Sequence, residues 1–268
     1  MAISALHAAA TGMRAMDEKL NVLANNIANI GTVGFKRSRV SFEDLLYQVK
    51  REPGLENVSN EPTPFGIQVG LGTQMSGTEL DFAQGPIDVS NNTLDMAIEG
   101  DGFFQVLAFY NGEEVSAYTR AGNFAVNANG ALVLGNSVGS LLEPSITIPS
   151  GAEVEITENG QVLTREPGQT NFTQSGQLAL ARFVNPKGLL QIGKNLYAQS
   201  DASGDPVAGN PGEDGIGVIR SGFLEMSNVD PVRELVELIR TQRYFELNSQ
   251  TVQSADESLQ VVAQLRRF

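Results

Sequence analysis

The sequence predicts an α+β protein, in which long N- and C-terminal helices form a coiled-coil-like assembly domain and the chain between them forms a central, mainly β domain of short strands and hairpins. Apolar residues recur at steps of three and four near both ends of the 268-residue chain, which is typical of helices. In the middle the period changes to two, and Asn-Gly pairs typical of hairpins appear. We expect a first helix over 1–32, an extended arm and β region over 33–95, a central β domain over 96–217, a return strand over 218–228 and a second helix over 229–268.

The composition excludes several classes of protein. No apolar run approaches the ~20 residues that span a bilayer, and the N-terminus lacks the basic and apolar regions of a cleaved secretory signal. There is no cysteine, which excludes disulfides and thiolate metal sites. The net charge of -13 argues against a nucleic-acid partner, because phosphate binding needs clustered Lys and Arg. We expect no cofactor.

The first helix carries an apolar stripe with the spacing of a coiled-coil seam. No proline interrupts it, and Gly31 and Gly34 follow at the place where helices usually end. A single helix of this kind is marginal in water, so we expect it to pack against other helices in an assembly. The expected subunit-assembly positions are Leu6, Met13, Met16, Leu20, Leu23 and Ile27.

The central region reads as short strands joined by turns. Asn111-Gly112, Asn129-Gly130 and Asn159-Gly160 are strong hairpin signals. The stretches 49–66 and 200–215 are rich in Gly, Pro and polar residues, and we expect irregular structure there.

The last helix has a clear start. Asp230 suits the N-cap and Pro231 the first helical position. A second apolar stripe follows, which we expect to contribute to the same assembly. Its positions are Leu235, Leu238, Phe245, Val252, Leu259 and Val262.

Two sequence patterns bear on enzymatic function. Asp95, Glu99 and Asp101 form an acidic cluster that could serve a carbohydrate-active enzyme, since glycosidases use paired carboxylates. Solvated surface positions and a tight turn at Gly100-Asp101-Gly102 are the favoured interpretation. GLLQIGKN (188–195) approaches a phosphate-binding loop, but Asn195 stands where Ser or Thr is needed, and no helix follows.

Two further candidate ligand sites, the acidic loop 200–215 and His7, have less support in the sequence. The acidic loop 200–215 resembles a calcium loop only in composition, because the alternating ligand pattern is absent. His7, the single histidine, has no second ligand candidate nearby, so a helix-surface or packing role is favoured. The sequence predicts no active site.

Three motifs resemble the signatures of the bacterial flagellar rod and hook family. ANNIANIGTVGFKR (24–37) resembles the end of that family's first helix, NNTLDMAIEGDGFFQV (91–106) its central motif, and the stretch 227–259 its C-terminal motif. They occur in the family's order and on the helix, β and helix regions expected above. The signature residues carried over are Asn25, Asn26, Asn29, Gly34, Phe35, Lys36, Gly100, Gly102, Phe103 and Phe104.

Within the family, FEDLLYQVKREPG (42–54) resembles the distal-rod branch. The segment from Tyr47 to Pro64 corresponds to a stretch associated with a straight rod rather than a curved hook. Its three prolines each fix a φ angle, so we expect a stiff arm between neighbouring subunits. The rod-specific positions are Tyr47, Arg51, Pro53, Gly54 and Pro64.

The resemblance implies a structural subunit of the basal-body distal rod that is not an enzyme. It implies a homo-oligomeric helical tube that transmits torque from motor to hook. The implied partners are proximal rod subunits, the hook protein, the peptidoglycan and outer-membrane ring proteins and the flagellar type III export apparatus. The implied location is the rod crossing the periplasm, reached without a cleaved signal peptide. A proximal rod or hook subunit is the close alternative, and the carbohydrate-active enzyme is the remote one.

Overall fold

The computed structural model describes residues 2–54, 64–110 and 112–265, and the chain divides into two compact units. The helical unit comprises Met1–Ala28, Ser38–Glu79 and Asp230–Phe268, and the β unit comprises Asn29–Arg37 and Leu80–Val229. The predicted α+β class, with a helix at each end and β structure between, is confirmed. The expected arm over 33–95 does not form one segment, because its middle part pairs with itself while its two ends are hydrogen-bonded into the β unit.

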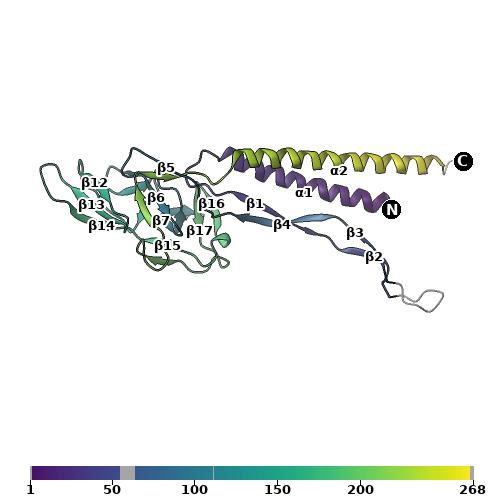
Figure 1. Ribbon diagram of the computed structural model, residues 1–268, viewed down its shortest axis with the longest axis horizontal. Helices are drawn as coiled ribbons and strands as arrows, with labels where there is room; N and C mark the ends of the chain where they lie inside the picture. Colours follow the sequence, from purple (N-terminus) through teal and green to yellow (C-terminus); the bar gives the residue numbers. More distant parts are fainter. Residues whose placement is uncertain (1, 55–63, 111, 266–268) are drawn as a thin grey trace. The chain divides into compact units, whose positions relative to one another are not determined.

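Two antiparallel helices, α1 (Ala2–Ala28) and α2 (Pro231–Leu265), lie side by side in the helical unit (Figure 1). The predicted start of α2 is confirmed, since the Asp230 carboxylate accepts hydrogen bonds from the backbone N–H groups of Val232 (2.9 Å) and Arg233 (3.2 Å). No helix in the described part of the chain is both long and apolar enough to cross a membrane.

The helical unit also contains a two-stranded ribbon in two parts. Strand β1 (Ser38–Asp44) pairs with β4 (Thr73–Leu80), and β2 (Tyr47–Arg51) pairs with β3 (Ile67–Gly70). The irregular stretch expected from residue 49 therefore starts as a strand, because aromatic and β-branched side chains favour extended backbone despite the nearby prolines. Residues 55–63 lie outside the described part of the chain.

The described part of the β unit contains five sheets. The largest has seven strands in the order β16-β17-β8-β7-β15-β18, with β11 also paired to β7. Its strands are β7 (Phe103–Tyr110), β8 (Glu113–Thr119), β11 (Leu142–Glu143), β15 (Leu180–Arg182), β16 (Leu190–Gly193), β17 (Leu196–Ala198) and β18 (Val207–Gly209). The smaller sheets pair β12 (Glu153–Ile156), β13 (Gln161–Arg165) and β14 (Thr173–Gln177); β9 (Phe124–Val126) and β10 (Leu132–Leu134); β6 (Met96–Glu99) and β19 (Val218–Ser221); and β5 (Ile87–Val89) and β20 (Phe223–Glu225). A short 3₁₀ helix, η1 (Pro186–Gly188), precedes β16.

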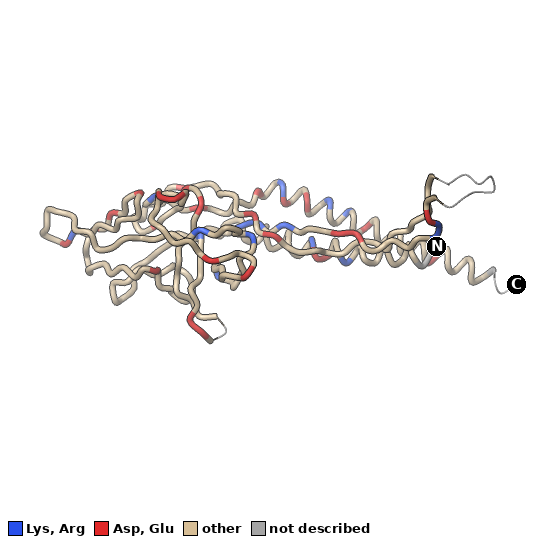
Figure 2. The backbone as a smooth tube through the Cα atoms, turned by 90° about the horizontal axis from the view of Figure 1, so that it is seen from below, with Lys and Arg blue, Asp and Glu red and all other residues tan. Residues whose placement is uncertain are grey.

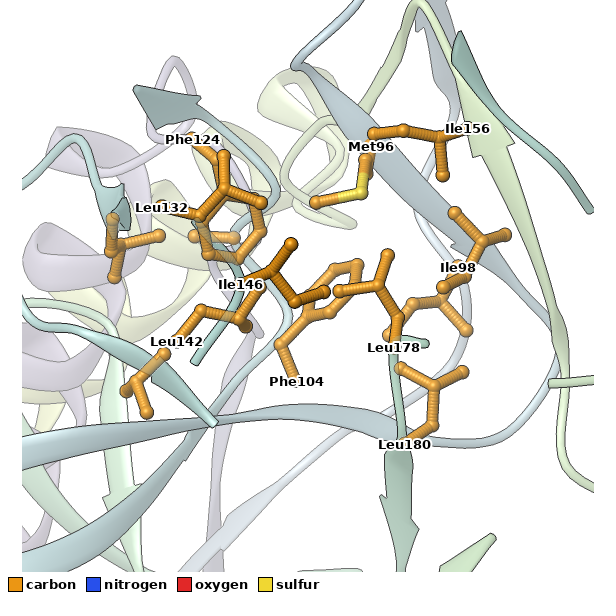
Figure 3. Close-up of a cluster of buried hydrophobic side chains, with 14 of the residues drawn as sticks. Met96, Ile98, Phe104, Phe124, Leu132, Leu142, Ile146, Ile156, Leu178 and Leu180 are labelled. Carbon is orange, nitrogen blue, oxygen red and sulfur yellow. The ribbon is translucent and has the colours of Figure 1, made fainter. Parts of the chain in front are cut away.

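The hydrophobic core of the β unit draws on most of these strands. Figure 3 shows Phe104, Ile146 and Leu178 pointing toward one another within one buried cluster. A second, aromatic cluster contains Phe103 and Tyr197, with Phe82 packed edge-on against both. Successive side chains of a strand point to opposite faces, so Phe103 and Phe104 of β7 enter different clusters.

The predicted hairpin turns are present where the chain is described. Gly112, Gly130 and Gly160 all have positive φ and follow β7, β9 and β12 respectively. Asn111, the partner of Gly112 in its pair, lies outside the described residues.

Candidate functional site

Asn26 lies in the last turn of α1, and its side chain forms two hydrogen bonds with the backbone of Ser38, as a neighbouring strand would. Asn26 donates from Nδ2 to the Ser38 carbonyl oxygen (2.8 Å) and accepts at Oδ1 from the Ser38 N–H (3.0 Å). Nδ2 also donates to Oε2 of Glu234 on α2 (3.2 Å), and both side chains are fully buried. One amide therefore joins the end of α1 to β1 and to the start of α2.

The residues after α1 turn the chain into the β unit. The Thr32 hydroxyl donates to Asn29 Oδ1 (3.1 Å), whereas Asn25 is exposed. Gly34 has φ +69°, and a Cβ there would lie 2.5 Å from the backbone nitrogen of Ala121. Only glycine fits both the left-handed conformation and the close approach. The bend that the sequence predicts after α1 therefore includes Gly34.

Lys36 of the same motif is buried completely and pairs with Glu225 on β20. Arg120, which is 3% exposed, approaches the other carboxylate oxygen of Glu225. Sequence analysis selected Lys36 and missed the other two. Glu225 in FLEM (223–226) and Arg120 in AYTRAG (117–122) are charged residues within or beside an otherwise apolar strand, and this pattern could have identified them.

The central signature has a structural role inside the β unit. Gly100 and Gly102 have φ of +105° and +145°, and they form the turn between β6 and β7. Phe103 and Phe104 follow directly and are buried in the two hydrophobic clusters. Gly100 is exposed in this turn, whereas Gly102, Phe103 and Phe104 are buried and shape the interior of the β unit.

Small residues line the buried face of α1. Ala9, Gly12 and Ala15 are buried, and a Cβ on Gly12 would lie 3.0 Å from the Asn248 amide of α2. Among the expected assembly positions on α1, Leu23 is buried at 4% exposure. The other five are half-buried: Leu6, Met13, Met16, Leu20 and Ile27.

The face of α2 toward α1 is more polar than expected. Glu234 and Thr241 are fully buried. Lys19 of α1 forms an ion pair with Glu237 at 3.1 Å, and this hydrogen bond lowers the pKa of Glu237. Among the expected assembly positions, Leu238, Val252 and Leu259 are half-buried, while Leu235, Phe245 and Val262 are exposed.

A second apolar stripe of α2 is open to solvent. Val232 is 70% exposed, Leu235 53% and Ile239 50%, and Val236 lies beside them. Their spacing of three and four residues places them on one face of the helix. We call Val232, Leu235, Val236 and Ile239 the outer stripe. It extends the expected assembly surface to residues that the coiled-coil pattern did not select.

The β2–β3 hairpin is also apolar and exposed. Its outward side chains are Leu46 (84% exposed), Phe65 (77%), Tyr47, Val49 and Ile67. At its described end the Arg51 guanidinium donates to the Phe65 carbonyl oxygen (3.1 Å).

The other rod-specific positions lie at the same end of the hairpin. Pro53 packs so closely against Gly66 that a Cβ on Gly66 would lie 2.8 Å from the proline ring, and Gly54 has φ +86°. Pro64 is exposed. Tyr47 and Arg51 are also paired with β3, so part of this segment is held by strand pairing.

Between α1 and the ribbon lies a cavity of about 550 Å³. Its lining includes Thr11, Arg14, Leu45, Thr73 and Met75. His7 also borders it and is exposed, with Nδ1 3.0 Å from the Leu71 carbonyl oxygen, which agrees with the expected helix-surface or packing role.

The carboxylates proposed for a remote enzymatic alternative do not form a catalytic pair. Asp95 is buried and accepts hydrogen bonds from the side chains of Ser90 and Asn92. Glu99 forms an ion pair with Arg220 across β6 and β19. These contacts give both carboxylates structural roles.

The weaker binding motifs have structural explanations too. In the GLLQIGKN stretch, Lys194 and Asn195 have φ of 57° and 60° and form the turn between β16 and β17. Within the described residues, no group of three or more His, Cys, Asp or Glu could hold a metal ion. Acidic residues are distributed along both units (Figure 2).

Three family descriptions match successive parts of the chain. "Flagella basal body rod protein" matches residues 6–36, "Flagellar hook protein FlgE/F/G D1 domain" matches 97–164, and "Flagellar basal body rod FlgEFG protein C-terminal" matches 220–265. The matched ranges overlap the first two motifs discussed above and include the third.

Curated relatives match over the full length. The chain is 44% identical to the flagellar basal-body rod protein FlgG of Agrobacterium fabrum, covering 97% of this chain and 98% of that protein. It is 42% identical to FlgG of Buchnera aphidicola (98% and 100%) and 38% identical to FlgG of Bacillus subtilis (99% and 100%). Among solved structures, the Helicobacter pylori flagellar hook protein FlgE2 matches with 16% identity and a TM-score of 0.24, covering 71% of this chain and 43% of that one.

Proposed function

Because the chain belongs to the flagellar basal-body rod family and is a structural subunit of the distal rod, not an enzyme, we propose that it polymerises through α1 and α2 into a rigid hollow shaft. In this proposal the shaft crosses the periplasm and carries torque from the motor to the hook. The proposed neighbours are proximal rod subunits, the hook protein and the ring proteins of the peptidoglycan and outer membrane. Export through the flagellar type III apparatus, without a cleaved signal peptide, belongs to the same proposal.

The outer stripe of α2 is the observation that carries the polymerisation. α1 packs on the opposite, partly polar face of α2, so the stripe has no partner among the described residues of this chain. Burying one Val, Leu or Ile side chain contributes about 1.5–3 kcal/mol. A second copy of the chain is a suitable partner, because a helical tube repeats the same contact along its length.

The exposed β2–β3 hairpin supports a second contact between copies. An isolated two-stranded hairpin is marginal in water, and this one exposes five large apolar side chains. We propose that it lies between neighbouring subunits and prevents the axial sliding that a curved tube requires. This contact would make the assembly a straight rod rather than a hook.

The polymerisation is tested by Ile239→Asp, with Thr251→Asp, at an exposed position of α2 away from the outer stripe, as the control. Both positions are exposed, so neither change disturbs the fold of the single chain. The charge at residue 239 would be buried in the contact between copies, where an unpaired carboxylate costs several kcal/mol. We expect basal bodies without complete rods for Ile239→Asp and normal rods for the control. Normal rods in both strains would show that the outer stripe is not part of the contact between copies.

A further inference from the structure

Three segments that are distant in sequence are held together by four polar side chains in the β unit. The segments are 34–37, 81–85 and 225–228. The four side chains, which we call the junction clasp, are Lys36, Arg120, Glu225 and Asn228.

Glu225 lies at the centre of the junction clasp. Its Oε1 accepts from Lys36 Nζ (2.6 Å) and from the Gly85 N–H (3.0 Å), and its Oε2 is 3.4 Å from Arg120 Nη1. Its backbone carbonyl accepts from the Gly34 N–H (2.8 Å). Lys36 Nζ also donates to the Ala83 carbonyl oxygen (2.8 Å). Glu225 therefore connects its own segment, 225–228, to the other two segments.

Asn228, three residues after Glu225, also connects its segment to the other two. Its Oδ1 accepts from the Arg37 N–H (2.8 Å), and its Nδ2 donates to the carbonyl oxygens of Asp81 (2.8 Å) and Ala83 (3.0 Å). The Asp81 N–H donates to the Arg37 carbonyl oxygen (2.9 Å) and completes the link between the first two segments.

The chemistry of the clasp favours one arrangement of the segments over any other. Burial lowers the pKa of Lys36, and the neighbouring Glu225 carboxylate opposes that shift. Removing one member of a buried ion group leaves an uncompensated charge, so partial separation of the segments is strongly unfavourable. Apolar residues of similar volume would pack as well, but they would not fix the register.

The position of the clasp in the chain suggests its use. The chain leaves the β unit after Arg37, re-enters it at Leu80 and leaves again after Val229. Force that runs along the chain from the helical unit enters the β unit at these connections or at Asn29. The clasp joins three of the four connections just inside the β unit.

We propose that the junction clasp is a mechanical interlock, which makes the β unit respond to force on its connecting segments as one body instead of losing those segments one at a time. Its biological use rests on the proposed role as a torque-carrying shaft. The interlock itself is a property of the single chain and can be measured without any rod.

The experiment pulls on the full-length chain in an optical trap. The protein has no cysteine, so thiol handles introduced by Thr78→Cys and Arg233→Cys attach only at those two exposed positions. Force between them runs along the chain and enters the β unit at Leu80 and Val229, beside the clasp segments 81–85 and 225–228. We expect the chain with native clasp residues to lose the β unit in a single step. With Glu225→Gln we expect a separate early step of short extension, as the connecting segments detach first.

At fixed force, the early step of Glu225→Gln should occur at least about tenfold faster than the single step of the chain with native clasp residues, because hydrogen bonds to charged groups contribute enough to change a rate by this factor. Glu99→Gln, which breaks the exposed pair with Arg220 in the same unit, is the control and should leave the single step unchanged. Asn228→Ala removes only neutral hydrogen bonds and provides a second variant if Glu225→Gln fails to fold. A single step at unchanged force in Asn228→Ala, or in a folded Glu225→Gln, would overturn the interlock. Failure of the proposed shaft would appear instead in basal bodies, which this measurement does not involve.

Discussion

Replacing Leu23 with aspartate tests how the helix pair is held together and whether the rod depends on it. Leu23 is the largest buried apolar side chain among the described side chains of α1, because the other buried positions are Ala9, Gly12, Ala15 and Asn26. Leu23 is therefore the most completely buried of the described large apolar side chains of α1, whose other members are half-buried.

The size of the effect follows from that position. Losing a buried leucine side chain costs about 2–5 kcal/mol. The new carboxylate would also be buried on the face of α1 that contacts the acidic start of α2, where Glu234 and Glu237 lie. Lys19 already pairs with Glu237, so it does not compensate the added charge. Burial of an unpaired carboxylate adds several kcal/mol to the loss in every subunit.

The assay combines swimming with electron microscopy of isolated basal bodies, at matched expression. We expect Leu23→Asp cells not to swim and to lack complete rods, while the purified chain keeps the thermal unfolding midpoint of its β unit. Asn21→Asp is the control, because it adds the same charge at an exposed position two residues earlier on α1. Leu259→Asp, on the half-buried face of α2, should behave like Leu23→Asp. Normal swimming by the Leu23→Asp strain would refute a shaft built on the helix pair.

Three further predictions follow from the structure. Gly34→Ala should destabilise the β unit by at least about 1–2 kcal/mol, since its left-handed φ is strained for alanine and the added Cβ would clash with Ala121, whereas Gly31→Ala, in open space, should leave the unfolding midpoint unchanged. Limited proteolysis of the dilute chain should remove roughly residues 1–30 and the last ~35 before the β unit, since helices with few partners are marginal; termini that resist protease would contradict this. Deleting residues 47–70 removes both strands of the exposed hairpin and should give bent rods in electron microscopy. Straight rods would show that the hairpin does not control the curvature of the rod.

Local sequence determined the secondary structure well. The Asp230-Pro231 start of α2 and the Asn-Gly turns were predictable because caps and tight turns depend on the conformations and hydrogen bonds of only a few neighbouring residues. The three motifs also predicted the family, which the full-length relatives establish. The strand at Tyr47–Arg51 was not predicted, because its stability comes from pairing with β3.

Burial and long-range polar contacts were decided only by the tertiary structure. The apolar period of α2 favoured Leu235 as a seam residue, yet Leu235 is exposed and its neighbour Glu234 is buried against Asn26. A helix with apolar residues on more than one face does not determine by its period which face meets its partner. Lys36 and Glu225 are 189 positions apart, and no local pattern specifies such a pair. Local sequence specified the start of α2 and the positions of the Asn-Gly turns, whereas the end of α1 at Ala28 was expected several residues later. The packed fold decided which charges are buried together, because that depends on contacts between segments brought together only by folding.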